Sequence, residues 1–264
     1  MREIKKANVA GSFYPENKGQ LQEFIQNLFS RVRVIKNYPN ARIFIIPHAG
    51  YIFSGPVAAT SYQELKASNP EFKKALVLSP SHYYSMDFVA APNFKSYLTP
   101  MGQIPVDQSM LRQIVNKGLC KYDDHPFEQE HALEVHLPFL QVLQPKFELV
   151  PLIVGQVTPE VVEEIIECAL QETKTVVVIS SDLSHFDNYE SANKKDQRTA
   201  QLITDLQISK LQGEMACGHY PLKGALLYAQ KHGLRVDCVD LRNSGDTAGD
   251  KARVVGYGGF VIHE

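Results

Sequence analysis

The hydrophobic positions of the chain fall into short, unbroken runs separated by longer segments with helical spacing. Four runs, at residues 43–46, 75–78, 149–154 and 175–179, consist mainly of Ile, Val and Leu and do not alternate regularly with polar residues. Such runs are typical of strands buried on both faces, as in the parallel sheet of an α/β protein. Two later segments, 235–241 and 253–263, predict strands that close the sheet.

The segments between these runs predict the helices. Periodicity or composition indicates helix at residues 20–33, 57–66, 107–117, 130–143, 159–170, 189–211 and 222–231. Residues 85–106 are punctuated by prolines and predict short strands and turns inserted into the same domain. The alternation of strands and helices indicates a single domain over residues 1–264. We expect it to be a three-layer α/β/α sandwich with a largely parallel central sheet.

Histidines follow three of the predicted strands at the point where each strand ends. His48 follows the first strand and His82 the second, whereas the fourth is followed by Asp182 and His185. Because the carboxyl ends of parallel strands share one edge and neighbouring strands lie about 4.8 Å apart, these side chains can meet around one ion or substrate. A lone histidine there is usually a hydrogen-bonded structural residue, but three in one sheet indicate a site.

A cysteine near the C-terminal part of the chain is a further candidate. Cys217 shortly precedes Pro221, and proline favours the first turn of a helix. A thiol near a helix N-terminus has a lowered pKa and is readier to act as a thiolate ligand or nucleophile. The alternative is a small buried packing residue. That reading stays open for Cys217 and is favoured for Cys120, Cys168 and Cys238.

The segment with His131, Glu134 and His136 has the residue types of a metal motif but not the spacing. In a regular helix His131 and Glu134 would lie about 60° apart, and His136 about 140° from His131. The three therefore cannot share a site through helix geometry, and no HExxH motif is present. His131 and Glu134 remain candidates for facing a substrate or supporting a ligand residue, with an ordinary helix surface as the alternative.

Charge and composition limit the kinds of partner that the protein is expected to bind. The formal net charge is −2 and the pI is about 6.5, without a basic stripe, which argues against nucleic acid. No apolar stretch approaches the roughly 20 residues that span a bilayer, and the charged first residues lead into no signal peptide. The four cysteines are far apart, as expected of reduced thiols. We expect a cytoplasmic protein that does not bind membranes.

Several segments resemble the Memo family, also called AmmeMemoRadiSam system protein B in prokaryotes. The matching segments run in order along most of the chain, at residues 11–14, 47–51, 79–82, 130–139, 180–185, 217–221 and 256–262. The family is similar in fold to class III extradiol dioxygenases, which are non-haem iron enzymes that open catechol-type rings. The resemblance therefore implies an extradiol dioxygenase-like fold.

The resemblance also implies roles for individual residues. His48, His82 and Cys217 would line a metal site, with His185 at the position of the dioxygenases' catalytic histidine. Those enzymes use two histidines and a carboxylate around iron. A cysteine in place of the carboxylate makes the site softer, so that iron or copper, and after them zinc, are the expected ions.

Two functions follow from these residues. In the first, the chain is a metal-dependent, dioxygenase-like redox protein in which His185 acts as acid or base and Asp182 fixes a histidine ring. In the second, it is a non-enzymatic binding module whose histidines and Tyr51 hold an anionic peptide or metabolite. The second follows from a eukaryotic relative described as an adaptor for phosphotyrosine peptides.

Overall fold

Four buried parallel strands form the centre of the molecule. The computed structural model describes residues 3–32, 36 and 38–264. In its main sheet, neighbouring strands follow the order β2 (Ile43–Ile46), β9 (Thr175–Ser180), β3 (Lys74–Pro80) and β8 (Glu148–Val154). All four run parallel, and nearly every residue in them is buried. The apolar runs thus became two-sided core strands, and the α/β class is confirmed.

Antiparallel pairings join further strands to both sides of the four parallel strands. On one side β12 (Val254–His263) pairs with β2, and both β11 (Arg235–Asn243) and β10 (His185–Asp187) pair with β12. On the other side lie β4 (Val89–Ala91) and β7 (Lys121–Tyr122). A separate small sheet joins β1 (Ile4–Lys6), β5 (Ser96–Thr99) and β6 (Gly102–Pro105). The predicted insertion at 85–106 accordingly supplies short strands to both sheets.

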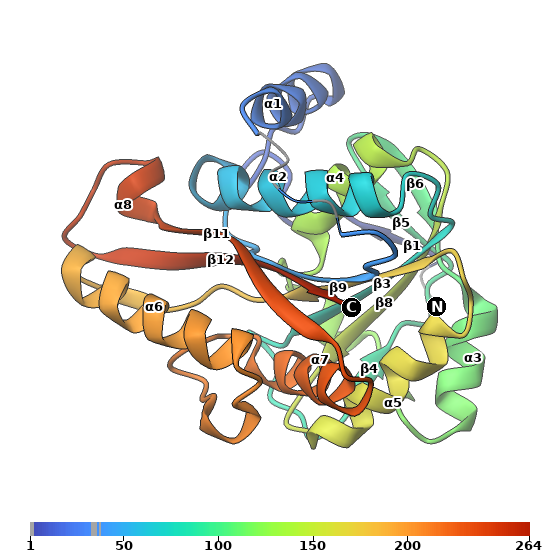
Figure 1. Cartoon of the computed structure of the whole chain (residues 1–264). Helices are drawn as coiled ribbons and strands as arrows, with labels where there is room; N and C mark the ends of the chain where they lie inside the picture. The colour runs from blue at the N-terminus through green and yellow to red at the C-terminus, as the bar shows by residue number, and fades with distance from the viewer. Residues whose placement is uncertain (1–2, 33–35, 37) are drawn as a thin grey trace.

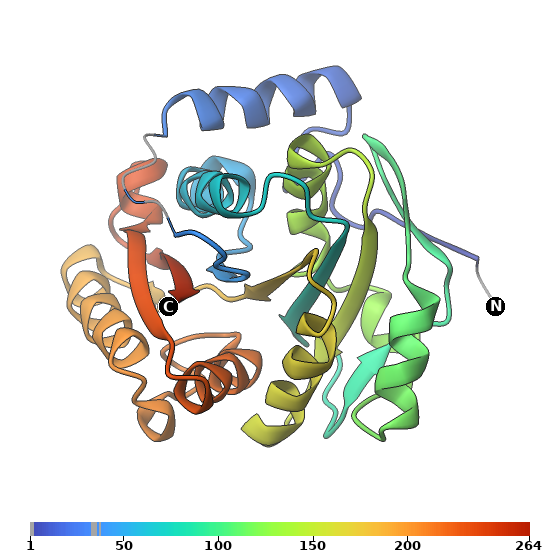
Figure 2. The same ribbon diagram turned by 45° about the vertical axis from the view of Figure 1, so that its right-hand side comes forward.

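Helices cover both faces of the main sheet (Figures 1 and 2). One face carries α2 (Tyr51–Ser68) and α4 (Leu137–Leu143), with α1 (Lys18–Ser30) outside them. The other carries α5 (Pro159–Leu170), α6 (Tyr189–Thr204) and α7 (His219–Lys231), with α3 (Gln108–Asn116) beside α5. The short α8 (Ser244–Thr247) precedes β12. The predicted sandwich is confirmed. None of the described helices has the length and apolar content needed to cross a membrane.

Helix α2 begins earlier than its pattern predicts. It starts at Tyr51, directly behind Gly50, and Pro56 lies inside it rather than before it. The ring of Pro56 fixes a helical φ, and its missing N–H removes only the bond to the carbonyl of Ile52. The helix therefore starts three residues after His48, which restricts the path of the backbone at that histidine.

The segment at residues 130–143 is not one regular helix. Residues Glu134–His136 form a 3₁₀ helix, α4 begins only at Leu137, and His131 precedes both. Pro138 cannot donate a hydrogen bond to the carbonyl of Glu134, so the α-helical ladder cannot extend backward through this point. The helical angles expected between His131, Glu134 and His136 therefore do not apply.

Candidate metal centre at the carboxyl edge of the sheet

Three neighbouring strands deliver polar side chains to one edge. His48 lies two residues beyond β2, Asp182 two residues beyond β9, and His82 two residues beyond β3. Since β9 lies between the other two strands, the loops that follow them are adjacent. The expectation that these loops meet at one edge is therefore met by the strand order, which no local pattern specifies.

Three imidazoles converge at this edge. One ring nitrogen from each of His48, His82 and His131 lies within 4.8 Å of the other two. The ring centroids are 5.0 Å apart for His82 and His131, 5.2 Å for His48 and His82, and 5.7 Å for His48 and His131. Phe13 packs 4.8 Å from the ring of His131. Imidazole nitrogens at such separations can hold one zinc, copper, iron or nickel ion.

His48 is held in the interior. Its side chain is 2% exposed, and its Nδ1 lies 2.6 Å from Oγ of Ser180. Its backbone N–H donates to Oδ1 of Asp182 at 2.7 Å. Burial first, and then the neighbouring histidines, lower the pKa of His48 well below its ordinary value. The ring is therefore neutral at physiological pH, which is the form that binds metals.

His82 is held by a buried carboxylate instead. Its Nδ1 lies 2.9 Å from Oε1 of Glu130. That oxygen also accepts the backbone N–H groups of His131 and Ala132 at 2.9 Å, and Oε2 accepts the backbone N–H of His82 at 2.6 Å. Burial acts to lower the pKa of His82, but the hydrogen bond and charge of Glu130 raise it overall. Burial acts to raise the pKa of Glu130, but its bonds to His82 and the backbone lower it. A carboxylate behind Nδ1 orients Nε2 toward a ligand, as in many metal sites.

Cys217 contacts the buried member of the group. Its Sγ lies 3.3 Å from Nε2 of His48 and accepts the backbone N–H of Asp182 at 3.3 Å. The backbone N–H of Cys217 in turn donates to the carbonyl of Asp182 at 3.2 Å. Next to it, Gly218 leaves no room for a side chain, because a Cβ there would lie 2.3 Å from the carbonyl oxygen of Ser180. The loop after β9 thus fixes the start of α7, and with it the thiol.

The expectation of a lowered thiol pKa is wrong. Burial, followed by the charge of Asp182, raises the pKa of Cys217, and the hydrogen bonds from the backbone do not compensate. The thiol therefore keeps its proton while no cation is bound. Among the other cysteines, Cys120 and Cys168 are buried as predicted, but Cys238 is exposed on β11, so packing does not explain it.

Asp182 does not hold a histidine ring by a short bond. One of its oxygens takes the backbone N–H of His48, and the other lies 4.0 Å from Nε2 of that ring. Burial raises the pKa of Asp182 to about 7. The predicted task of fixing imidazole rings falls instead to Ser180 for His48 and to Glu130 for His82.

His185 begins β10 at the outer side of the same edge. Burial, with a contribution from the charge of His82, lowers the pKa of His185. The pairing of β10 with β12 shifts register between His185 and Asp187, and Phe186 between them has a left-handed φ of 63°. Such bulges re-aim side chains and are frequent beside active sites. His185 therefore follows a backbone path set by tertiary pairing.

Two predicted site residues lie in the core instead. The hydroxyl of Tyr51 donates to the carbonyl of Val135 at 2.7 Å, and the side chain is 2% exposed. Glu134 accepts the backbone N–H groups of Asn8 and Val9 and the hydroxyl of Tyr14. Both residues tie the N-terminal segment and α2 to the loop before α4. Neither faces a ligand, because their polar atoms are already engaged by the protein.

Two residues of the centre, Glu130 and Ser180, escaped the sequence analysis, and His136 was considered there only for its helical spacing from His131. His136 is buried, and its Nε2 lies 2.8 Å from Oγ of Ser180. The only local indication was position, since Ser180 ends a predicted strand and Glu130 directly precedes His131. The rings that they contact, His82 for Glu130 and His136 for Ser180, lie 48 and 44 residues away along the chain, so no short pattern identifies them.

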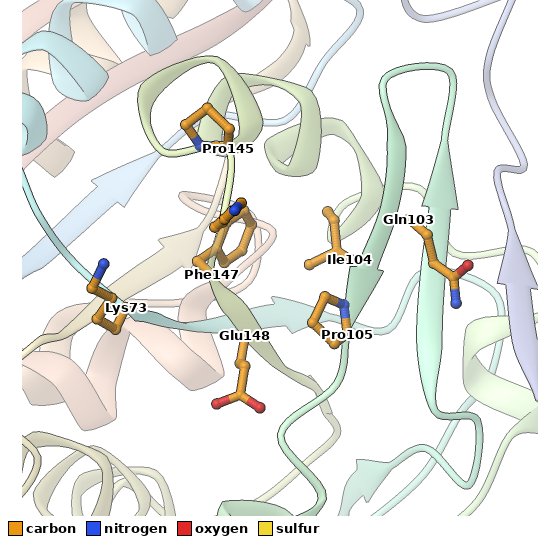
Figure 3. Close-up of a pocket in the computed structure, with 8 residues that line it drawn as sticks. Lys73, Gln103, Ile104, Pro105, Pro145, Phe147 and Glu148 are labelled. Carbon is orange, nitrogen blue, oxygen red and sulfur yellow. The ribbon is translucent and has the colours of Figure 1, made fainter.

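A hollow of about 360 Å³ opens beside the centre. Its lining includes His82, Tyr83, Tyr84, Cys217, His219 and Tyr220. A second hollow, of about 430 Å³, lies at the opposite ends of β3 and β8 and is shown in Figure 3. The described residues that line the second hollow include no histidine or cysteine. Of these two hollows, only the one at the carboxyl edge is lined by histidine and cysteine side chains.

Comparisons with known proteins agree with the sequence resemblance. A family model described as Memo-like protein matches residues 5–261. A MEMO1 family protein of Nitrosopumilus maritimus is 30% identical over 271 residues, which cover 97% of this chain and 98% of the relative. A MEMO1 family protein of Saccharolobus solfataricus is 34% identical over 272 residues, covering 94% and 95%.

The fold also has a relative among solved structures. The uncharacterized protein JW3007 of Escherichia coli K12 superimposes with a TM-score of 0.51 at 12% identity. The match covers 84% of this chain and 99% of that one. At this identity the similarity concerns the fold alone.

Proposed function

Because this chain belongs to the Memo family, we propose that it is a metal-dependent redox protein that binds one transition-metal ion at the carboxyl edge of its sheet. His48 and His82 are the two shared ligands, and Cys217 is the third. His131 is the competing third ligand, because its nitrogen belongs to the same close group. The observation that carries the proposal is that ring nitrogens of three histidines converge, and that two of these rings are already held in place by hydrogen bonds to the protein.

The donor set fits such an ion. Nδ1 of His48 and of His82 are engaged by Ser180 and Glu130, which leaves Nε2 of each ring for coordination. Nδ1 of His131 is buried and lies 3.5 Å from Oε1 of Glu130, without a hydrogen bond among the described residues. The thiol of Cys217 contacts Nε2 of His48, so an ion there would replace one proton. Two imidazoles and a thiolate suit iron, copper or zinc.

When bound, a redox-active iron or copper ion would supply one-electron chemistry toward oxygen or an organic substrate. The protein contributes the surroundings of that reaction. The hollow lined by Tyr83, Tyr84 and Tyr220 receives the substrate beside His82. His185, a neutral imidazole at the outer side, accepts or returns a proton at the substrate, which is the ordinary role of a general base.

Metal content tests the proposal. Protein purified without added metal and then loaded should contain about one ion per chain by elemental analysis. His48→Ala and His82→Ala should each lose most of it. His125→Ala is the matched control, because His125 is exposed and lies outside the group of three. Full retention by both ligand variants would exclude the site.

Spectroscopy of the loaded protein identifies the third ligand. A thiolate about 2.3 Å from Cu(II) or Co(II) gives an intense sulfur-to-metal absorption band. We expect Cys217→Ser to abolish this band and Cys238→Ser to leave it unchanged. A band that survives in Cys217→Ser, combined with metal loss in His131→Ala, would assign the third position to His131.

One observation favours the alternative of a binding module. The nitrogen of His131 that joins the close group and the tyrosines at the mouth of the hollow would hold an anion without any metal. In that case, metal-free protein should bind phosphotyrosine by calorimetry, and His131→Ala should weaken the binding. Binding that requires the metal would exclude this alternative.

A further inference from the structure

A chain of hydrogen bonds runs from His48 into the interior. Nδ1 of His48 lies 2.6 Å from Oγ of Ser180, which lies 2.8 Å from Nε2 of His136. Nδ1 of His136 then lies 2.8 Å from the hydroxyl of Tyr62, in the middle of α2. All four side chains are at most 2% exposed. The chain therefore connects a metal-facing ring to the far side of the core without passing through solvent.

The hydroxyl of Ser180 determines where the protons lie. It makes a third contact, at 2.8 Å, with the carbonyl oxygen of Ala132. A carbonyl oxygen can only accept, and a serine hydroxyl has one proton and two acceptor lone pairs. The single proton of Ser180 is therefore donated to Ala132, and both imidazole nitrogens that contact Ser180 must donate to it.

The proton positions on both rings follow. His48 carries its proton on Nδ1, so Nε2 has a free lone pair toward Cys217 and the metal position. His136 carries its proton on Nε2, so its Nδ1 accepts the hydroxyl proton of Tyr62. Burial lowers the pKa of His136 to about 3, so the ring is neutral and has one proton to place. Every donor and acceptor in the chain is satisfied by this one arrangement.

We propose that Ser180, His136 and Tyr62 are positioning residues that lock His48 as the Nδ1–H tautomer and thereby keep Nε2 ready for the metal. Only the consequence for metal affinity rests on the proposed function, because the tautomer is a property of the metal-free protein. His82 reaches the same state through one carboxylate, Glu130. Behind Nδ1 of His48 a chain of neutral groups serves instead, and it needs no buried charge at that position.

Nitrogen NMR of the metal-free full-length protein tests the lock. Long-range proton–nitrogen correlations report which ring nitrogen is protonated, and His48→Gln and His136→Gln assign the signals. We expect the wild type to show His48 as Nδ1–H and His136 as Nε2–H. In Ser180→Ala, His48 should shift toward Nε2–H. The matched control is Ser79→Ala, since Ser79 is equally buried on β3 and its hydroxyl has no partner among the described residues.

The outer end of the chain is tested by Tyr62→Phe. Loss of the hydroxyl frees His136 to carry its proton on Nδ1, so a mixture of tautomers should appear for His136. Tyr97→Phe is the control, because Tyr97 is a fully buried tyrosine outside the chain. Since Tyr62→Phe fills the same space, it also decides the matter if Ser180→Ala does not fold.

Metal affinity gives the functional arm. Loss of a residue that orients a metal-binding histidine commonly weakens metal binding about 10- to 100-fold. We expect that loss in Ser180→Ala, a smaller loss in Tyr62→Phe, and none in the two controls, by Co(II) competition titration.

The outcomes separate the two hypotheses. A wild-type His48 protonated on Nε2, or tautomers that respond to neither variant, overturns this inference even if the protein binds metal. Conversely, locked tautomers in a protein that binds no metal support the inference and reject the proposed function. Locked tautomers together with weakened metal binding in Ser180→Ala support both.

Discussion

Two hollows of similar size lie at opposite ends of the same two strands. One, of about 360 Å³, lies where β3 and β8 end, and the other, of about 430 Å³, lies where they begin (Figure 3). The first is lined by His82 and Cys217, whereas the second is lined by Lys73, Glu148 and Phe147. Volume alone would rank the second hollow higher. The difference in chemistry identifies the site.

The charged groups of the two edges differ in whether they have partners. At the amino edge, Lys74 already forms ion pairs with Asp107 at 2.6 Å and Glu172 at 2.7 Å. At the carboxyl edge, His48 and His82 are each bonded on one nitrogen and turn toward the same space. The ion pairs of Lys74 neutralise its charge, whereas the second ring nitrogen of His48 and of His82 remains available. Binding capacity therefore depends on which groups the fold leaves unpaired.

The largest expected difference between the two edges of the sheet is in catalysis. If the carboxyl edge is an active site, His185→Ala should keep the metal and reduce turnover about 100-fold or more, the usual scale for a general acid or base. Elemental analysis and an oxygen-consumption assay measure the two quantities. Loss of the metal in this variant would instead make His185 a ligand.

A pair of glutamates compares the two edges directly. In Glu130→Gln, an NH₂ group replaces an oxygen that accepts N–H donors, so the free energy of unfolding should fall by about 2–3 kcal/mol. Glu148→Gln at the amino edge should change it by less than about 0.5 kcal/mol, because Glu148 is exposed. Urea unfolding of both variants is the measurement. Equal losses would mean that the two carboxylates contribute equally to the free energy of unfolding, against this prediction.

Acid should weaken the carboxyl edge through His136. Its pKa is about 3 in the folded protein, against an ordinary value of 6.5, so only the unfolded chain takes up the proton between them. This contribution to stability is complete above about pH 6.5 and falls by about 1.4 kcal/mol for each pH unit below it.

The matching variant isolates that proton. His136→Gln should show a flatter pH dependence of the free energy of unfolding between about pH 6.5 and pH 5. The raised pKa of Asp182 acts in the opposite sense, but it is present in both proteins and cancels in the difference. His125→Gln, which removes an exposed imidazole, should keep the steeper loss of the wild type. Identical slopes for the wild type and His136→Gln would contradict the assignment.

The smallest effect is expected at the second hollow. Lys73→Ala and Lys146→Ala alter the lining of that hollow without touching a histidine of the centre. Metal content and the free energy of unfolding should both stay close to wild type, within about 0.5 kcal/mol for the latter. A loss of metal in either variant would remove the distinction between the two edges.

Much of the fold could be predicted because its signals are local. The unbroken runs at β2, β3, β8 and β9 predict buried strands, and strand polarity places His48 and His82 at one edge. The bounds of α5 match the predicted 159–170, and those of α3 fall within 107–117, with Asp107 as the N-cap. These features depend on residues within a few positions of one another.

Other features were decided only by packing between distant segments. The order of the strands put β9 between β2 and β3, and the loop before α4 carried His131 to the same space. Tyr51 and Glu134 have the residue types of a site, but their polar atoms form hydrogen bonds within the core. The hydroxyl of Tyr51 bonds the carbonyl of Val135, and the carboxylate of Glu134 bonds the N-terminal segment. The spacing of residues along the chain does not show which of these hydrogen bonds will form.

The protonation of the centre shows the same division. The sequence placed Cys217 near a helix start, where a lowered pKa is expected, yet burial beside Asp182 raised it. Similarly, the sequence supplied Ser180 and His136 without any sign that they contact each other or His48. A residue's chemical type is encoded locally, whereas its desolvation and hydrogen-bond partners are set by the whole fold. Sequence alone therefore predicted that His48 and His82 lie at one edge, whereas tertiary structure brought His131 to it and determined which nitrogen of His48 and His82 is free to bind.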